Sequence, residues 1–269
     1  MAIVVKEEKI KEVPVLFVSK EDSQAKSVIF LFHKLLNNKE QGLPLAYELA
    51  KEDYLVILLD MHGHGQREIS YDTSRRYEFN HLLKDIQATE ADVKTILNSE
   101  KLNTLYGLKN LKIKVAGVSI GGTIALSCFM HMKEIDSMVS IAGTYDLKFI
   151  IDNDRLDSFK LFAASSPVID YERAKEERKT LDIANYLSNE KARPALFMDG
   201  MLDTTVSIDA RKEFHDELMK IYKSYGKENL IKHKEYAKTG HEVTKQMVKD
   251  LIEWLSEQEE GVGIHESYG

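Results

Sequence analysis

A serine between two glycines, with an apolar run before it and small residues after it, constrains the fold of this chain most. The segment 111–130 reads LKIKVAGVSIGGTIALSCFM. Its alternating apolar residues up to Gly117 favour a strand, and the run after Gly121 favours a helix. A strand that turns directly into a helix holds the residue at the apex in a strained conformation with its hydroxyl exposed. The segment therefore predicts a tight turn that presents Ser119 as a nucleophile.

The composition narrows the class of protein. The chain has 269 residues, of which 43% are apolar, and this suits one large core. A formal net charge of −7 argues against nucleic acid or an anionic membrane surface as the main partner. No apolar run approaches the roughly 20 residues of a membrane span, and the charged start, MAIVVKEEKIKEV, does not read as a signal peptide. The single cysteine, Cys128, suits a reducing compartment, so we expect a cytoplasmic protein.

Apolar runs of strand length alternate with amphipathic stretches of helix length. Strands are predicted at 3–5, 13–18, 27–33, 54–60, 113–117, 138–142, 194–199 and 232–236, and helices at 43–51, 80–99, 207–225 and 242–255. Apolar strands joined by helices are typical of a mostly parallel sheet covered on both faces. The prediction is an α/β fold with about eight strands and a frayed tail from about residue 256.

The alternation stops between residues 144 and 193, where no apolar strand occurs. Charged helical pieces and aromatic or aliphatic clusters fill this stretch. We expect one domain over 1–269 with a helical cap at 144–193 over the sheet edge. The apolar face of this cap either serves packing alone or also lines a pocket.

Two later motifs offer partners for Ser119. Asp203 stands in GMLDTTV after one predicted strand, and His241 stands in KTGHE after the last. The order serine, acid, histidine is that of the α/β-hydrolase superfamily, which the chain resembles over residues 13–255. Within it the chain is most similar to the branch of esterases, dienelactone hydrolases and prolyl-oligopeptidase-like enzymes, which have a loop similar to DMHGHG at 60–65. The resemblance implies the α/β-hydrolase fold.

The resemblance also implies a role for each residue of the site. His241 would take the serine proton, and Asp203 would hold the imidazole and stabilise its charged form. The backbone N–H of Ile120 would be one oxyanion donor and that of Leu35 the second. The usual His-Gly-x of this second loop reads HKL here at residues 33–35, so the sequence leaves its path and its donor open.

Other residues offer alternative interpretations. Asp146 is a rival acid, because some members of the superfamily carry the acid after the preceding strand. Asp60, His62 and His64 suggest a metal site, but a metal needs three or four ligands and the sequence offers no second cluster. We therefore expect no metal and no cofactor, with these residues bracing their loop. His33 is expected to pack or hydrogen-bond beneath the site.

The sequence predicts a serine hydrolase, most specifically a carboxylesterase that cleaves small or medium acyl esters through an acyl-serine intermediate. A peptidase or a thioesterase with the same three residues is an alternative, as is a catalytically weak ligand-binding protein on the same fold. The natural substrate and the oligomeric state do not follow from the sequence.

Overall fold

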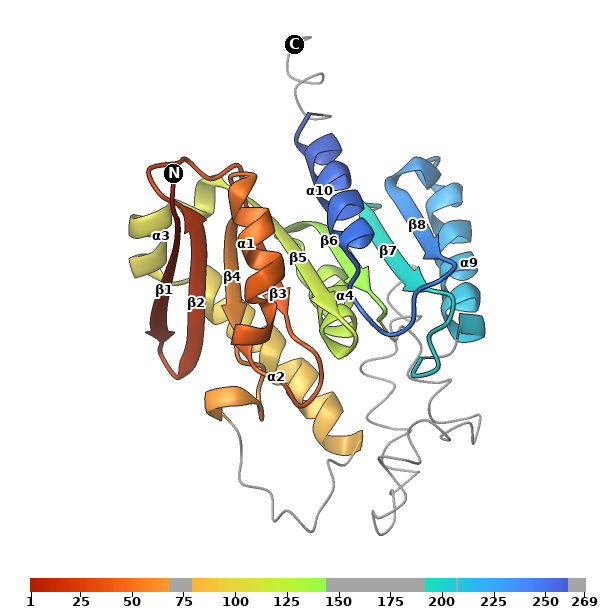
Figure 1. Cartoon of the computed structure of the whole chain (residues 1–269), viewed down its shortest axis with the longest axis horizontal. Helices are drawn as coiled ribbons and strands as arrows, with labels where there is room; N and C mark the ends of the chain where they lie inside the picture. The colour runs from red at the N-terminus through yellow and green to blue at the C-terminus, as the bar shows by residue number, and fades with distance from the viewer. Residues whose placement is uncertain (68–78, 144–191, 207, 261–269) are drawn as a thin grey trace.

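The computed structural model describes residues 1–67, 79–143, 192–206 and 208–260. In these ranges, eight strands form one sheet in the order β1-β2-β4-β3-β5-β6-β7-β8 (Figure 1). Strand β2 is antiparallel to both of its neighbours, and every other pair is parallel. The predicted mostly parallel α/β sheet is confirmed. The strands are β1 (Ile3–Ile10), β2 (Val13–Lys20), β3 (Ser27–Phe32), β4 (Leu55–Leu59), β5 (Lys112–Val118), β6 (Ile135–Ile141), β7 (Ala195–Gly200) and β8 (Ile231–Tyr236).

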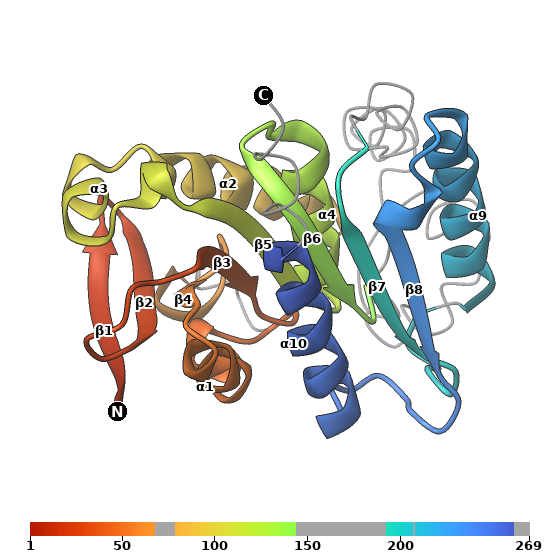
Figure 2. The ribbon, with the colours of Figure 1, turned by 90° about the horizontal axis from the view of Figure 1, so that it is seen from above.

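Helices cover both faces of the sheet (Figure 2). One face is covered by α1 (Leu43–Lys51) and α10 (Lys245–Glu260), and the other by α2 (Phe79–Leu97), α3 (Glu100–Tyr106), α4 (Ile120–His131) and α9 (Ile208–Ser224). The central strands β3 and β4 are buried along their whole length, since successive side chains alternate between two apolar layers. None of the helices in the described ranges combines the length and apolar content that crossing a membrane would require.

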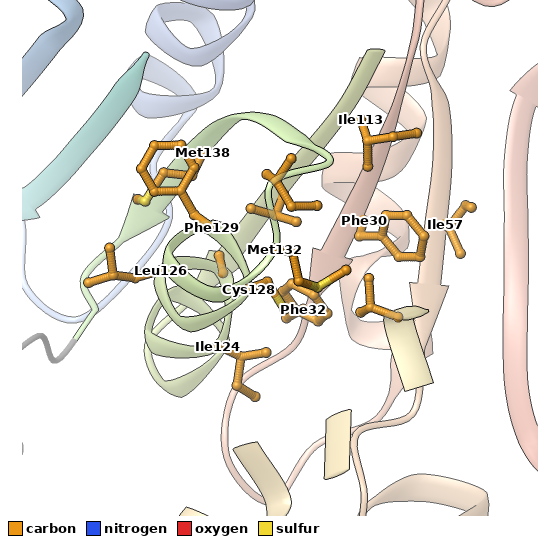
Figure 3. Packing of buried hydrophobic residues seen from close by; sticks show 14 of the residues in the cluster. Phe30, Phe32, Ile57, Ile113, Ile124, Leu126, Cys128, Phe129, Met132 and Met138 are labelled. Atoms are coloured by element: carbon orange, nitrogen blue, oxygen red, sulfur yellow. The ribbon is translucent and has the colours of Figure 1, made fainter. Parts of the chain in front are cut away.

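Helix α4 is the most deeply buried helix around the predicted nucleophile. Every residue from Ile120 to Phe129 is buried, and a helix that is apolar on every side needs such surroundings. Ile124, Cys128 and Phe129 lie in the same cluster as Phe32 of β3 (Figure 3). Burying each large apolar side chain contributes roughly 1.5–3 kcal/mol. The turn before α4 therefore stands on a densely packed base.

Helix α10 corrects two expectations drawn from the sequence. It begins at Lys245 instead of residue 242, and it continues to Glu260 through the first residues of the stretch expected to be frayed. Glu259 supplies a physical reason for this extension. Its carboxylate accepts a hydrogen bond from the Ser27 hydroxyl at 2.6 Å and pairs with the Lys114 ammonium at 3.2 Å. These contacts attach the last turn of the helix to β3 and β5.

The short helix α3 was not predicted. The Ser99 hydroxyl accepts the Leu102 N–H at 3.4 Å at its start, and Gly107 ends it in a left-handed conformation, φ 64°. Helix α3 is too short for its periodicity to stand out from the preceding helix. The cap expected at 144–193 lies outside the described residues, apart from its last two.

Candidate active site

Ser119 occupies the turn between β5 and α4, as predicted. Its backbone has φ 58° and ψ −123°, a combination that costs an L-residue free energy. Hydrogen bonds on both sides hold it there: the Ser119 N–H donates to the Ile141 carbonyl at 2.8 Å, and the Ser119 carbonyl accepts the Gly122 N–H at 2.8 Å. The end of β6 and the first turn of α4 thus fix the serine.

Two glycines allow this turn to close. A Cβ on Gly117 would lie 2.0 Å from the carbonyl oxygen of Gly121, and a Cβ on Gly121 would lie 2.4 Å from that of Phe32. Backbone atoms cannot yield to such overlaps, so both positions require glycine. The second contact also brings the first turn of α4 against the end of β3. The loop that begins at His33 therefore starts beside the serine turn.

The structure brings Ser119, Asp203 and His241 together. The Ser119 Oγ lies 2.8 Å from His241 Nε2, and His241 Nδ1 lies 2.8 Å from Asp203 Oδ2. Asp203 follows β7 and His241 follows β8, and parallel strands end at the same edge of a sheet. A Cβ on Gly200 would lie 2.3 Å from the Gly240 carbonyl oxygen, so glycine lets the acid and histidine loops touch. The rival acid, Asp146, lies outside the described residues.

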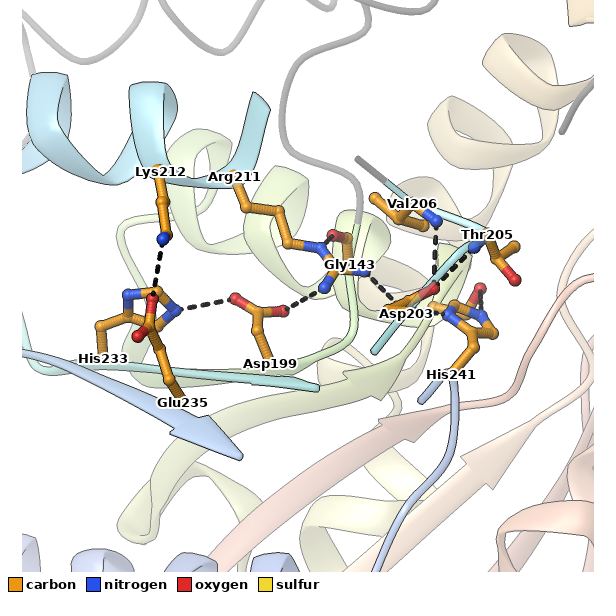
Figure 4. A network of polar contacts seen from close by, with 11 residues as sticks. Gly143, Asp199, Asp203, Thr205, Val206, Arg211, Lys212, His233, Glu235 and His241 are labelled. Carbon is orange, nitrogen blue, oxygen red and sulfur yellow. Dashed lines mark hydrogen bonds and ion pairs between the residues drawn. The ribbon is translucent and has the colours of Figure 1, made fainter. Parts of the chain in front are cut away.

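The carboxylate of Asp203 is buried and surrounded by donors (Figure 4). Its Oδ1 accepts the N–H groups of Thr205 and Val206 at 2.8 and 3.1 Å. Its Oδ2 accepts from His241 and, at 2.5 Å, from the guanidinium of Arg211. Burial by itself raises the pKa of this carboxyl, but the hydrogen bonds from His241 and Arg211 and the charge of Arg211 outweigh it, and the pKa lies well below its usual range. Asp203 is therefore ionised at every pH at which the fold would be assayed.

The loop after β3 tolerates a lysine where the superfamily usually has glycine. The left-handed residue of this loop is Leu36, φ 58°, and Lys34 is not in that region, so its Cβ causes no backbone strain. The Lys34 ammonium reaches the His241 carbonyl at 3.4 Å. Leu35 packs partly buried against the main core cluster. The loop that carries one proposed oxyanion donor thus touches the histidine loop.

His33 anchors this loop from below, as expected. Its Nε2 accepts the Met61 N–H at 3.2 Å, which leaves the proton on Nδ1, where it is donated to the Lys34 carbonyl at 2.8 Å. The ring is therefore neutral and links the ends of β3 and β4. Burial lowers the pKa of His33 to about 4.

The anchoring of His33 predicts a loss of stability in acid. A histidine in an unfolded chain takes up its proton near pH 6.5, whereas folded His33 does so near pH 4, where its pKa lies. Between these values the unfolded chain binds a proton that the folded chain does not, so acid favours unfolding. The contribution of His33 is complete above about pH 6.5, and about 3 kcal/mol of it is lost by pH 4.

Urea unfolding of the wild type and His33→Gln at pH 7, 5.5 and 4 measures this effect. Glutamine keeps an acceptor for the Met61 N–H but does not titrate, and other acid-sensitive groups cancel in the comparison. The wild type should lose about 3 kcal/mol more than the variant between pH 7 and pH 4. Parallel pH profiles of the two proteins would contradict the assignment.

The residues that suggested a metal hold their own loop together. The Asp60 carboxylate accepts the Lys39 N–H at 2.8 Å and ammonium at 3.1 Å, and the Gln66 N–H at 3.1 Å. His62 Nδ1 lies 2.7 Å from Asp85, and His64 Nδ1 lies 2.9 Å from the His62 carbonyl. Among the described side chains, no three histidine, cysteine or acidic residues are grouped as metal ligands would be.

A comparison with protein families identifies the family of this chain. Residues 23–227 match the hydrolase family described as serine aminopeptidase, S33. The chain belongs to this S33 hydrolase family. The matched range of the S33 hydrolase contains Ser119 and Asp203, while His241 lies beyond it. A search of curated proteins finds no match.

Solved structures share the fold of this S33 hydrolase at low sequence identity. A Thermus thermophilus protein, TT1662, is 17% identical with a TM-score of 0.75, and the match covers 97% of this chain and 99% of that one. An esterase from Pyrococcus furiosus is 20% identical with a TM-score of 0.61, covering 96% and 91%. The acylaminoacyl peptidase of Pyrococcus horikoshii is 17% identical with a TM-score of 0.71, covering 95% of this chain but 42% of that one. These likenesses show the α/β-hydrolase fold that the sequence predicted.

Sequence reasoning missed one member of the site of this S33 hydrolase. Arg211 is 2% exposed and bonds to Asp203. The available signal was its place on the buried stripe of α9, because Phe214 and Leu218 follow it at helical spacing. A cation in the first turn of a helix also opposes the helix dipole, so a specific partner was to be expected.

Proposed function

We propose that this S33 hydrolase is a carboxylesterase for small or medium acyl esters, with Ser119 as nucleophile, His241 as base and Asp203 as acid. The observation that carries the proposal is the unbroken hydrogen-bond relay of Ser119, His241 and Asp203, with 2.8 Å at each step. Such a relay activates a serine hydroxyl for attack on an acyl carbon.

The relay supports a two-step reaction. As Ser119 Oγ bonds to the acyl carbon, its proton passes to His241 Nε2, while Nδ1–H stays bonded to Asp203. The tetrahedral intermediate expels the alcohol, which takes the proton from Nε2, and leaves an acyl-serine. Water then attacks this ester while His241 Nε2 takes a proton from it. The second tetrahedral intermediate breaks its bond to Ser119 Oγ, which takes that proton from Nε2, and the carboxylic acid leaves. We assign the oxyanion to the N–H groups of Ile120, at the free start of α4, and of Leu35.

An apolar groove lined by chain neighbours of Ser119 and His241 supports an acyl substrate. It has a volume of about 890 Å³ and runs between α1 and α10. Its lining includes Val118, which precedes Ser119 in the chain, and Glu242, which follows His241, but not Ser119 or His241 themselves. Leu31 and Leu45 belong to its apolar floor, and a groove of this size holds a medium acyl chain.

We also propose a domain organisation and a cellular location for this chain. We treat the chain as one domain in which residues 144–193 form a cap that selects the substrate. A cytoplasmic location is supported by the single cysteine, Cys128, which is buried in α4. Burial raises the pKa of its thiol well above the usual value, so this cysteine stays a neutral apolar residue.

A peptidase is the second candidate, because the family description names a serine aminopeptidase. The relay could serve an amide as well as an ester, since both pass through a tetrahedral intermediate. Amide cleavage depends more strongly on protonation of the leaving nitrogen, and His241 Nε2–H would supply that proton.

Matched substrates separate these candidates. We expect kcat/KM to be highest for ethyl butyrate or ethyl octanoate, lower for butyryl-CoA, and lowest for N-ethyl butyramide and alanine amide. Unactivated esters are chosen because p-nitrophenyl esters also react with adventitious nucleophiles. Faster cleavage of alanine amide than of alanine methyl ester would identify an aminopeptidase, and tight binding of all substrates without turnover would identify a binding protein.

A further inference from the structure

A row of buried charges continues the relay behind Asp203 (Figure 4). The Arg211 guanidinium lies between two carboxylates, 2.5 Å from Asp203 Oδ2 and 3.2 Å from Asp199 Oδ1. The other oxygen of Asp199 lies 3.0 Å from His233 Nε2 on β8. Asp203, Arg211 and Asp199 are each no more than 6% exposed. Burying charged groups costs desolvation free energy, and this cost is offset only where the charges are closely paired in a fixed geometry.

Arg211 connects three elements that end at the site. It stands in the first turn of α9, and its Nε donates to the Gly143 carbonyl, just beyond β6, at 3.2 Å. Its two terminal nitrogens face Asp199, in the last part of β7, and Asp203, in the loop after β7. The planar fork of a guanidinium directs the hydrogen bonds to Gly143 and Asp203 at fixed angles, which an ammonium could not do, and Asp199 adds an ion pair.

These contacts leave the Asp203 carboxylate no freedom to rotate. Two backbone N–H groups hold Oδ1, and Arg211 and His241 share Oδ2. Oδ2 is the oxygen that accepts the Nδ1–H of His241. The guanidinium therefore determines where the imidazole must point, and a 1 Å error in such a position can cost about 100-fold in rate.

Asp199 supplies a negative charge that offsets the positive charge of Arg211. A guanidinium beside Asp203 alone would neutralise the carboxylate and weaken its attraction for a charged imidazole. With both carboxylates ionised, Asp199, Asp203 and the guanidinium carry one net negative charge, which His241 faces at Asp203 and His233 faces at Asp199. Two carboxylates and one guanidinium thus match the single positive charge that His241 acquires during the reaction.

We propose that Arg211 is a positioning residue of the reaction: it fixes the orientation and charged state of Asp203, with Asp199 as its counter-charge. This role rests on the proposed function of Ser119, Asp203 and His241. If Arg211 only joined α9 to β7, its replacement would change stability but would leave the pH profile and the ratio of kcat to KM unchanged.

The test compares Arg211→Lys with the double variant Asp199→Asn/Arg211→Met. The double variant removes one positive and one negative charge together, so the buried site keeps its net charge and the chain avoids an unpaired carboxylate at Asp199. Ester hydrolysis from pH 4.5 to 8.5, the rate of fluorophosphonate labelling, and urea unfolding are measured for each. Lys212→Met, an exposed neighbour on α9, is the control.

We expect kcat of the folded double variant to fall about 100-fold with KM changed less than about twofold. The acid limb of its kcat/KM profile should move to higher pH, because Asp203 loses its guanidinium. Arg211→Lys should keep the acid limb at the wild-type pH, because lysine keeps the positive charge. It should retain only part of the wild-type kcat, because an ammonium lacks the planar fork of the guanidinium. A folded double variant with the wild-type kcat and profile would overturn the role of Arg211, as would a double variant that cannot fold combined with a fully active Arg211→Lys. A wild type that is neither active nor labelled would instead overturn the proposed function.

Discussion

Ser119→Ala should lower kcat for ester hydrolysis by about a million-fold and abolish labelling by a fluorophosphonate probe. The Ser119 hydroxyl is the group that lies 2.8 Å from His241 Nε2, so its removal takes away the nucleophile while the base and acid stay in place. Residual turnover above the rate in water, on the order of 10³-fold, would come from the oxyanion donors and from substrate binding.

This variant should also keep its stability. Alanine fits the φ of 58° at position 119 as poorly as serine does, so the strain of the turn is unchanged. Ser224→Ala, an exposed serine in the last turn of α9, is the matched control and should behave as the wild type. Undiminished labelling of folded Ser119→Ala would show that another residue is the nucleophile.

Asp203→Asn should lower kcat by about 10⁴-fold although asparagine has nearly the same shape. Every partner of the Asp203 carboxylate in the described residues is a donor: two backbone N–H groups on one side, and His241 and Arg211 on the other. An amide has one acceptor oxygen, so its NH₂ must face donors in either orientation. If it faces His241, the imidazole turns its acceptor nitrogen toward the amide and presents Nε2–H to Ser119, which then has no base.

The same substitution should destabilise the fold by about 2 kcal/mol, because hydrogen bonds to a charged group are lost. Urea unfolding and steady-state kinetics of the same preparation measure both effects. Asp209→Asn, an exposed aspartate near the start of α9, controls for the loss of one negative charge. A folded Asp203→Asn protein with more than a tenth of the wild-type kcat would mean that another acid serves His241.

Much of the fold could be predicted from local patterns, because each pattern reflects burial on one or two faces. Strands such as Ser27–Phe32 and Leu55–Leu59 are apolar throughout, and the sheet covers them on both sides. The predicted helix boundaries were wrong where contacts with residues distant in the sequence decide where a helix ends. The end of α10 depends on the contacts of Glu259 with Ser27 and Lys114, which are far away in the sequence.

The candidate site residues and their order could be read from local sequence patterns: a serine on a turn between glycines, then an acid, then a histidine, each after a strand. That followed from steric rules and strand ends, which are local. The way these groups are held follows from contacts between segments that are distant in the sequence. These contacts set the 2.8 Å spacings, put Leu36 of the β3 loop in the left-handed region, and place Arg211 between two carboxylates. Such placements depend on how β7, α9 and the loops pack in three dimensions, and the spacing of residues along one chain does not contain that information.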